Sequence, residues 1–378
     1  MNFVEHVAKT MVLAPAGIPV PLGRVCRTPE EARALFAEVG PCVVKAQVPV
    51  GKRGKAGGIK AANSAVEAAA RAKDILALTI DGHPVSELLL EQQASIVREY
   101  YAAVMIDFTA RRPLVLFSTE GGMDIEEVAA RNPASIRRQL IELDTGFTRA
   151  AARELLAGLD LGTSHDQIAD VLVRMYAAFT ARDCELIEIN PLAVLGDGRV
   201  VALDCKLTLD DSSVSRQADL AAFGAPELMT DLERRGAAAG LRFIQLDGNI
   251  GLLANGAGLT MTTMDVISHQ GGRPANFLEI GGEAYTKAEI ALDLVLSNPG
   301  VKSLVVNFCG AFARTDVMAD GVVKAWQKLK PTIPVFFSIH GTGEEEARAI
   351  VRRELGLEPM DFMEEAVAAA IAAAQVAT

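Results

Sequence analysis

The sequence predicts an α/β protein with two domains, the second of which contains a parallel β-sheet. Its 378 residues, half of them hydrophobic, are enough for about two or three domain cores. Apolar strands alternate with helices in the last third, which is typical of a parallel sheet covered on both faces. The first two-thirds instead mix helices with hairpin-forming strands. We therefore expect two domains of different architecture, residues 1–232 and 240–378.

The first domain is expected to begin with an amphipathic helix. Thr28-Pro29-Glu30-Glu31 is a capping box with proline at the first helical position, so a helix should run to about Glu38. Asp197-Gly198 is a hairpin signal that should join strands at Glu185–Leu195 and Arg199–Leu209. The other expected strands are Cys42–Val48, a short one at Ile59, Glu87–Ala94, Glu99–Asp107 and Pro113–Thr119, and the other expected helices are Ser64–Leu78, Asp124–Arg131 and most of Thr148–Arg182.

The second domain is expected after a polar boundary segment within Asp210–Leu241. Runs such as Leu304–Phe308 are mostly apolar rather than alternating, which favours strands buried on both faces. The expected strands lie near residues 242–247, 275–280, 301–308 and 333–339, and the expected helices near 259–269, 285–297, 312–328, 343–354 and 362–375.

The composition disfavours several classes of protein. With 48 acidic and 37 basic residues the net charge is −11, which disfavours broad binding to nucleic acid. No apolar run approaches the roughly 20 residues that span a bilayer, and Met1–Gly17 carries Glu5, His6 and Lys9 where a signal peptide would be apolar. The five cysteines are scattered without a CxxC pair, so neither disulfides nor a zinc site is expected. We expect a cytoplasmic protein that binds neither nucleic acid nor membranes.

A loop rich in glycine and basic residues, Gly51–Gly58, follows the strand that carries Lys45. Glycines let backbone amides approach an anion closely, and Lys52, Arg53 and Lys55 supply positive charge. Because no GxxxxGK[ST] motif follows a strand, the segment is not a P-loop. Two interpretations stay open, a lid over phosphate groups and a solvated surface turn.

The predicted hairpin carries oxygen ligands. Glu188 and Asn190 point to one face because side chains alternate along a strand, and Asp204 comes from the partner strand. Such ligands suit Mg²⁺, which completes its shell with water and phosphate; the polar face of a one-sided sheet is the alternative. Glu91, beside an apolar run, and Glu99 are candidate acceptors for a ribose hydroxyl or an exocyclic amine, although surface carboxylates are commoner.

Two glycine-containing loops are expected at the carboxyl ends of strands in the second domain. Asn255-Gly256-Ala257-Gly258 precedes a helix, and Asn307–Arg314 joins a strand to a helix. Ligands bind at this edge of parallel sheets, where helix N-termini favour anions. Close packing of helix on strand is the alternative explanation for the glycines. The five histidines lack metal-site spacing, and His340, after a strand, is either a site residue or a structural one.

Ordered motifs from Asn2 to Ala373 resemble the β subunit of succinyl-CoA synthetase and its relatives, the ADP- or GDP-forming carboxylate–CoA ligases. The resemblance implies an ATP-grasp domain over residues 1–232, followed by a flavodoxin-like, parallel-sheet CoA-ligase domain over residues 240–378. The segments that carry the resemblance are Arg53–Gly58, Ser118–Gly122, Ile187–Leu192, Leu246–Gly251, Asn255–Leu259 and Pro274–Leu278.

The resemblance also implies roles for individual residues. Asn190 and Asp204 match magnesium ligands, and Glu188 matches a carboxylate that meets a phosphorylated histidine loop. The positions that match nucleotide contacts are Lys45, Lys52, Arg53, Gly54, Glu91, Ala94 and Glu99. The positions that match the site where the acid substrate and the phosphohistidine meet are Asn255, Ala311, Phe312 and Ala313.

The function that the resemblance implies requires a partner. Mg·ATP would phosphorylate a histidine of an α subunit. A small di- or tricarboxylic acid would then form an acyl phosphate. CoA, bound mainly by the α subunit, would displace the phosphate. The assembly is a heterodimer or an α2β2 heterotetramer, and the preference for ADP or GDP stays open. Two other functions stay open as well: an ATP-grasp ligase that forms amides, against which the second domain argues, and a regulatory nucleotide-binding subunit without turnover.

The sequence departs from the family pattern at several positions. Ala311 and Phe312 replace a glycine and a smaller aliphatic residue near the expected acid site, so we expect malate, citrate or another small carboxylate to be preferred over succinate. Lys52 replaces a glycine, which predicts a stiffer and more cationic lid. The remaining departures are Pro49-Val50 for His-Ala or His-Ser, Gly281-Gly282-Glu283 for a glycine-rich turn, and His340 for a glutamate.

Overall fold

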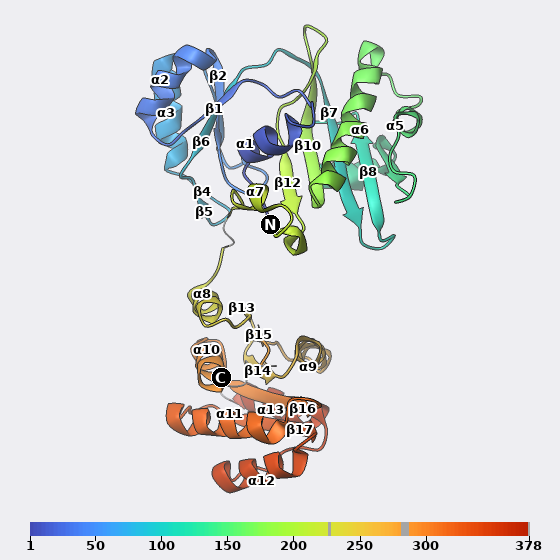
Figure 1. Cartoon of the computed structure of the whole chain (residues 1–378). Coiled ribbons are helices and arrows are strands. Elements are labelled where there is room, and N and C mark those ends of the chain that lie inside the picture. The colour runs from blue at the N-terminus through green and yellow to red at the C-terminus, as the bar shows by residue number, and fades with distance from the viewer. Residues whose placement is uncertain (226–227, 281–286, 377–378) are drawn as a thin grey trace. The chain divides into compact units, whose positions relative to one another are not determined.

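The computed structural model describes residues 1–225, 228–280 and 287–376. The chain divides into two compact units, Met1–Leu228 and Met229–Thr378 (Figure 1). Helix α8 (Asp231–Ala238), through which the sequence-based division at residue 232 passes, lies entirely in the second unit. The departure at Glu283 lies outside the described residues. No helix in the described ranges is both long enough and apolar enough to cross a membrane.

A four-stranded antiparallel sheet with two helices forms one part of the first unit. Its strand order is β1 (Gly23–Cys26), β6 (Leu88–Gln92), β2 (Cys42–Ala46) and β3 (Ile59–Ala62). Helices α2 (Pro29–Val39) and α3 (Ala65–Leu76) pack side by side against it (Figure 1). The predicted start of α2 is confirmed, because Thr28 Oγ1 accepts a hydrogen bond from the Glu31 amide at 3.1 Å.

A six-stranded antiparallel sheet forms the other part. Its order is β11 (Val200–Ala202), β10 (Cys184–Leu195), β7 (Ile96–Asp107), β8 (Arg112–Ser118) and β9 (Ile136–Leu140), with β12 (Lys206–Leu209) also paired to β10. Helices α5 (Arg149–Leu155) and α6 (His165–Ala181) pack on it, and α6 buries Ile168, Leu172 and Met175 (Figure 1). The predicted hairpin is confirmed, but its second strand is interrupted at residues 203–205, and β9 was not predicted.

The remaining elements of the first unit are short. The N-terminal segment is α1 (Glu5–Val7) followed directly by a π-helix (Ala8–Leu13) that buries Val12 and Leu13 in the core of the larger sheet. The other elements are β4 (Thr79–Ile80), β5 (His83–Pro84), α4 (Ile125–Arg131), α7 (Ala218–Ala221) and the 3₁₀ turns Pro133–Ser135, Gly162–Ser164 and Asp211–Ser213.

The second unit contains a three-stranded parallel sheet in the order β14 (Ile250–Ala254), β16 (Ser303–Gly310) and β17 (Val335–Gly341). The parallel arrangement that the sequence predicts is therefore confirmed for these strands. Strand β14 was not predicted, because none of the expected strands covers residues 250–254. Strand β15 (Asn276–Leu278) pairs antiparallel with β13 (Phe243–Gln245), and flanking residues join β14 by parallel bridges.

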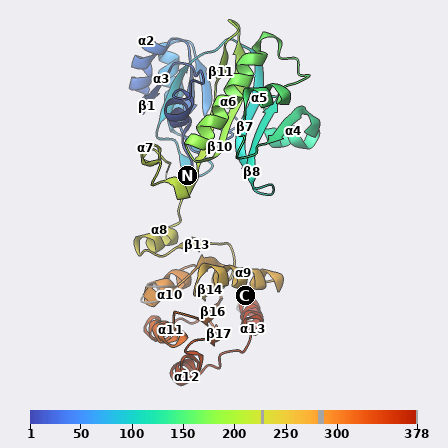
Figure 2. The ribbon, with the colours of Figure 1, turned by 45° about the vertical axis from the view of Figure 1, so that its right-hand side comes forward.

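Helices cover both faces of this sheet, as its apolar strands predict. Helices α10 (Ala288–Leu296), α11 (Thr315–Leu329) and α12 (Glu344–Leu355) enclose one core, which contains Val306 and Phe308. Helices α9 (Ala257–His269) and α13 (Met363–Val376) enclose the other, which contains Leu252 and Val305 (Figure 2). Because neighbouring strand residues point to opposite faces, both need apolar side chains.

Phe308 provides a test of this packing. Its side chain is fully buried between β16 and the covering helices, so Phe308→Ala should lower the free energy of unfolding of the second unit by about 3–5 kcal/mol. Urea unfolding followed by the fluorescence of Trp326, the single tryptophan of the chain, measures this loss. Phe362→Ala is the matched control, since Phe362 is 64% exposed, and an equal loss in both variants would contradict the packing.

Candidate functional site

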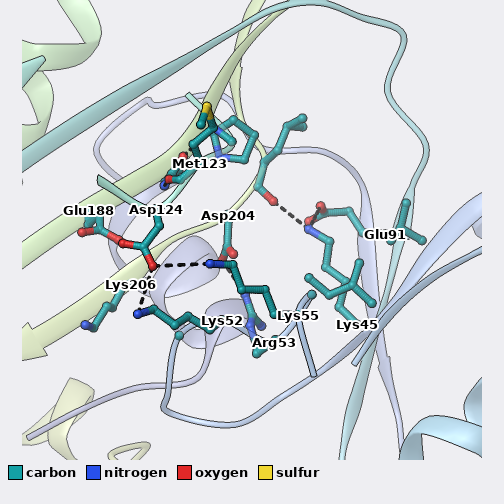
Figure 3. Close-up of a pocket in the computed structure, with 18 of the residues that line it drawn as sticks. Lys45, Lys52, Arg53, Lys55, Glu91, Met123, Asp124, Glu188, Asp204 and Lys206 are labelled. Carbon is teal, nitrogen blue, oxygen red and sulfur yellow. Dashed lines mark hydrogen bonds and ion pairs between the residues drawn. The ribbon is translucent and has the colours of Figure 1, made fainter. Parts of the chain in front are cut away.

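A cavity of about 650 Å³ lies in the first unit (Figure 3). Strands β2 and β6 line it from the smaller sheet, β10 and β12 from the larger one, and the basic loop Gly51–Gly58 and the segment Gly122–Glu126 complete the lining. Nine of the predicted site residues lie on it together: Lys45, Lys52, Arg53, Gly54, Glu91, Ala94, Glu188, Asn190 and Asp204.

A buried network of charges lies along one side of the cavity, and only some of its members line it. Glu5 of α1 is 2% exposed, and its Oε1 accepts hydrogen bonds from Lys9 Nζ at 2.6 Å and Lys45 Nζ at 2.9 Å. Lys9 Nζ also donates to Glu91 Oε2 at 2.5 Å, and Lys45 Nζ donates to Glu91 Oε1 at 2.6 Å. The interpretation of Glu91 as a surface carboxylate is therefore wrong, because cations from two separate elements bury it.

Arg53 extends this network to the predicted metal ligand. Its Nη1 lies 2.9 Å from Glu5 Oε2, and its Nη2 donates to Asp204 Oδ1 at 2.6 Å. The guanidinium is 5% exposed, so the interpretation of the basic loop as a solvated turn fails for this residue. Three cations and three carboxylates thus meet in one network, whose members are Lys9, Lys45, Arg53, Glu5, Glu91 and Asp204.

Neighbouring charges hold three members of this network in their ionised forms, whereas burial raises the pKa of a fourth, Glu91. Burial alone would raise the pKa of Glu5, but Lys45, Lys9 and Arg53 hold it well below its ordinary value. At Lys45 and Arg53 burial would lower the pKa, and the neighbouring carboxylates raise it instead. Glu5, Lys45 and Arg53 are therefore charged near neutral pH, and removing one partner would leave a buried charge uncompensated.

The basic loop reaches across to the start of α4. Lys52 Nζ lies 3.0 Å and Lys55 Nζ 3.6 Å from Asp124 Oδ2 (Figure 3). Lys55 also pairs with Glu127. A hydrogen bond from Glu126 and the contact with Lys52 hold the pKa of Asp124 below its usual range. Lys52 adopts a φ of +61°, a left-handed conformation that favours glycine. A lysine at this position therefore carries a backbone cost that a glycine would not.

Asn190 and Asp204 present oxygen atoms to the cavity. Asn190 Oδ1 accepts from the Gly122 amide and its Nδ2 donates to the Met123 carbonyl, both at 2.8 Å. No described residue donates a hydrogen bond to Asp204 Oδ2. The donor set fits Mg²⁺, which takes few protein oxygens and keeps phosphate and water. The described residues contain no group of three or more histidine, cysteine or acidic side chains placed to hold a metal ion.

Glu188 lies on the same strand as Asn190 and has a dedicated donor. The hydroxyl of Tyr101, on β7, donates to Glu188 Oε2 at 3.0 Å. Burial raises the pKa of Glu188 above that of an exposed glutamate, and the hydrogen bond from Tyr101 opposes this rise. Glu99, by contrast, is not among the lining residues. Its carboxylate lies against Gly122, where an added Cβ would come within 2.4 Å of Oε2.

The predicted acid-site residues lie in the second unit, at the carboxyl edge of the parallel sheet. The Asn255 side chain exchanges two hydrogen bonds with the backbone of Cys309, at 2.7 and 2.8 Å, which ties the ends of β14 and β16 together. Phe312 is fully exposed. The helix expected near residues 312–328 begins later than predicted, because α11 begins at Thr315 and residues 311–313 form the preceding bend.

Three residues of the first-unit site were not predicted. Glu5 and Lys9 were noted only as evidence against a signal peptide, although an i,i+4 pair of opposite charges in an apolar segment indicates a helix with a special polar face. Tyr101 gave no signal, because a tyrosine in an apolar strand resembles any core residue. Only the paired strands β7 and β10 bring its hydroxyl to Glu188.

Comparison with known proteins assigns the chain to a family. It is 43% identical, over 93% of both chains, to the succinate–CoA ligase [GDP-forming] β subunit of Thermus thermophilus. It is also 43% identical, over 99% of both chains, to the succinate–CoA ligase [ADP-forming] β subunit of Chloroflexus aurantiacus. The chain belongs to the succinate–CoA ligase β-subunit family. Two family profiles agree, since an ATP-grasp domain matches residues 2–194 and a CoA-ligase domain matches residues 253–373.

The fold of this succinate–CoA ligase family member also resembles solved structures. The ATP citrate lyase of Methanothrix soehngenii, solved with citrate and coenzyme A, matches with a TM-score of 0.71 over 98% of this chain and 99% of that chain. The sequence identity is 21%, so the likeness concerns the fold alone. The cavity with the buried network lies in the unit that the ATP-grasp profile matches.

Glu5→Gln tests the buried network. It leaves Lys9, Lys45 and Arg53 with one carboxylate fewer, so the free energy of unfolding of the first unit should fall by about 3–5 kcal/mol at pH 7. Because the pKa of Glu5 is lowered on folding from an ordinary 4.5, its charge stabilises the fold above that pH and loses this effect in more acidic solution. The difference between wild type and variant, measured by urea unfolding, should therefore shrink below about pH 4.5.

The matched control for this test is Glu38→Gln. Glu38 forms an exposed ion pair with Arg24, with 49% of its side chain accessible, so its loss should change the stability by less than about 1 kcal/mol. A Glu5→Gln variant as stable as this control would contradict the network.

Proposed function

We propose that this chain binds Mg·ATP in the cavity of its first unit and, together with an α subunit, ligates a small carboxylic acid to CoA. The observation that carries the proposal is the union of three kinds of group on one cavity. Lys45, Lys52 and Arg53 supply positive charge, Asn190 and Asp204 supply oxygen ligands, and a buried carboxylate stands beside them. A metal-bound triphosphate needs the first two, and membership of the succinate–CoA ligase family supports the same assignment.

In this proposal the protein acts by positioning and by neutralising charge. Lys45, Lys52 and Arg53 meet phosphate oxygens, and the glycines of the basic loop let its amides come close. Asn190 and Asp204 hold Mg²⁺, which when bound offsets the negative charge of the phosphates. Glu188 accepts a hydrogen bond from the imidazole of the incoming histidine and so orients it. The bond from phosphorus to the ADP oxygen breaks as the bond from phosphorus to the histidine nitrogen forms.

The partner follows from the same proposal. The relatives are named as β subunits, and we propose that an α subunit carries the phosphorylated histidine and most of the CoA site. The carboxyl edge of the parallel sheet, with Asn255 and the bend Ala311–Ala313, receives the phosphohistidine and the acid. Succinate is the first candidate acid, because the relatives are named for it. Malate or citrate is the second, since Ala311 and Phe312 depart from the family pattern.

The deciding experiment uses the chain alone and with its α subunit. Alone, the chain should bind Mg·ATP and form no acyl-CoA. With the α subunit, it should phosphorylate a histidine of that subunit and convert one acid of a panel of small carboxylates to its CoA ester. Acyl-CoA synthesis by the isolated chain would overturn the division of labour. ATP binding without phosphotransfer in the complex would indicate a regulatory subunit instead.

Asp204→Asn tests the metal ligand. The amide keeps an acceptor for Arg53 but removes the charge that favours Mg²⁺, so histidine phosphorylation at low millimolar Mg²⁺ should fall by at least about 100-fold, within the range for lost charge stabilisation at such sites. Radiolabel transfer from ATP measures it. Asp197→Asn, in the exposed hairpin turn, is the matched control. Phosphorylation of the α subunit by Asp204→Asn at the control's rate would remove Asp204 from the site.

The bend before α11 tests acid specificity. Phe312 is exposed in this chain and, in the proposal, faces acid bound in the complex. Phe312→Ile with Ala311→Gly should shift the ratio of kcat/KM values toward succinate by roughly tenfold, the size expected when pocket volume changes by a few methylene groups. Phe362→Ile, at another exposed position, is the control. Unchanged ratios in the double variant would show that these residues do not set specificity.

A further inference from the structure

Lys9 and Lys45 donate hydrogen bonds to the same three residues. Lys9 Nζ donates to Glu5 Oε1 at 2.6 Å, to Glu91 Oε2 at 2.5 Å and to the Leu203 carbonyl at 2.8 Å. Lys45 Nζ donates to Glu5 Oε1 at 2.9 Å, to Glu91 Oε1 at 2.6 Å and to the same carbonyl at 2.6 Å. An ammonium group has three protons, so each lysine is saturated by one set of partners.

The two lysines differ in one respect, which is access to the cavity. Lys45 lines it, whereas Lys9 lies behind, on the π-helix of the N-terminal segment, and is not among the lining residues. Figure 3 shows Lys45 beside Glu91 on one side of the pocket. For Lys45 to bind a phosphate oxygen, its ammonium group must break at least one of its three present hydrogen bonds.

Without Lys9, such a movement would be costly. Glu5 and Glu91 are 2% and 3% exposed. Glu91 would then keep no cation and Glu5 would keep only Arg53, and a buried carboxylate that loses its cation is strongly disfavoured. With Lys9 in place, Glu5, Glu91 and the Leu203 carbonyl each keep a donor after Lys45 turns away. The duplicated contacts therefore lower the cost of releasing Lys45.

We propose that Lys9 is a positioning residue that holds Glu5, Glu91 and the Leu203 carbonyl, so that Lys45 is free to bind a phosphate group of the nucleotide. This inference rests on the proposed function, since it takes the ligand of the cavity to be Mg·ATP. Lys9 acts through Lys45 and does not touch the nucleotide. Its contribution to nucleotide affinity therefore exists only while Lys45 is present.

A double-mutant cycle on the full-length chain tests the proposal, with Mg·ATP titrated calorimetrically. Lys9→Met should weaken binding at least about tenfold, equivalent to about 1.4 kcal/mol, because Lys45 must then stay with the two carboxylates. Lys45→Met should weaken it as much or more. The double variant should bind no more weakly than Lys45→Met alone, since Lys9 has no other route to the nucleotide. Lys60→Met, at a surface ion pair with Asp74, is the matched control.

The outcomes separate this inference from the proposed function. A wild-type chain that does not bind Mg·ATP overturns the proposed function itself. A wild-type chain that binds, with Lys9→Met binding equally well, overturns only the role of Lys9. Losses that add in the double variant indicate a general structural role and overturn it too. Should Lys9→Met not fold, Glu5→Gln/Lys9→Met removes one charge of each sign and must still bind less tightly than wild type.

Discussion

The buried network around Glu5 is the constraint on which the first unit depends. One carboxylate meets cations from three elements: Lys9 on the π-helix, Lys45 on β2 and Arg53 in the basic loop that follows β2. Charges buried this deeply are tolerated only when each has a partner, so the three elements are held in fixed relation. The N-terminal segment contributes no lining residue, but it fixes the side chains of Lys45 and Arg53, which do line the cavity.

The interruption of the hairpin serves the same network. A continuous second strand would engage the backbone around residue 204 in ladder hydrogen bonds. The break between β11 and β12 instead leaves the Leu203 carbonyl to accept from Lys9 and Lys45 and turns Asp204 toward Arg53. Irregular backbone beside a cavity re-aims polar groups in this way, and its cost is offset by the contacts that it allows.

Local signals in the sequence predicted local structure well. The capping box at Thr28, the hairpin at Asp197-Gly198 and the apolar strands of the parallel sheet each depend on residues close in the chain, and each is confirmed. The pairing of Lys9 with Glu91 spans 82 residues, and no local pattern encodes it. Phe312 was predicted to lie in the first turn of a helix, but α11 begins at Thr315. No capping residue near Phe312 marks this later start in the sequence.

The charge balance of the cavity bears on how it would take a polyanion. Its lining carries five basic and five acidic side chains, in a chain whose net charge is −11. The cavity is therefore not a region of strongly positive potential, and long-range electrostatic attraction contributes little to the binding of a polyanion. In the proposed complex the phosphates must replace carboxylates as partners of Lys45, Lys52 and Arg53. Affinity then depends on how well the displaced carboxylates are satisfied elsewhere. A second cation behind the first, as at Lys9, and a metal beside Asp204 are two ways to satisfy them.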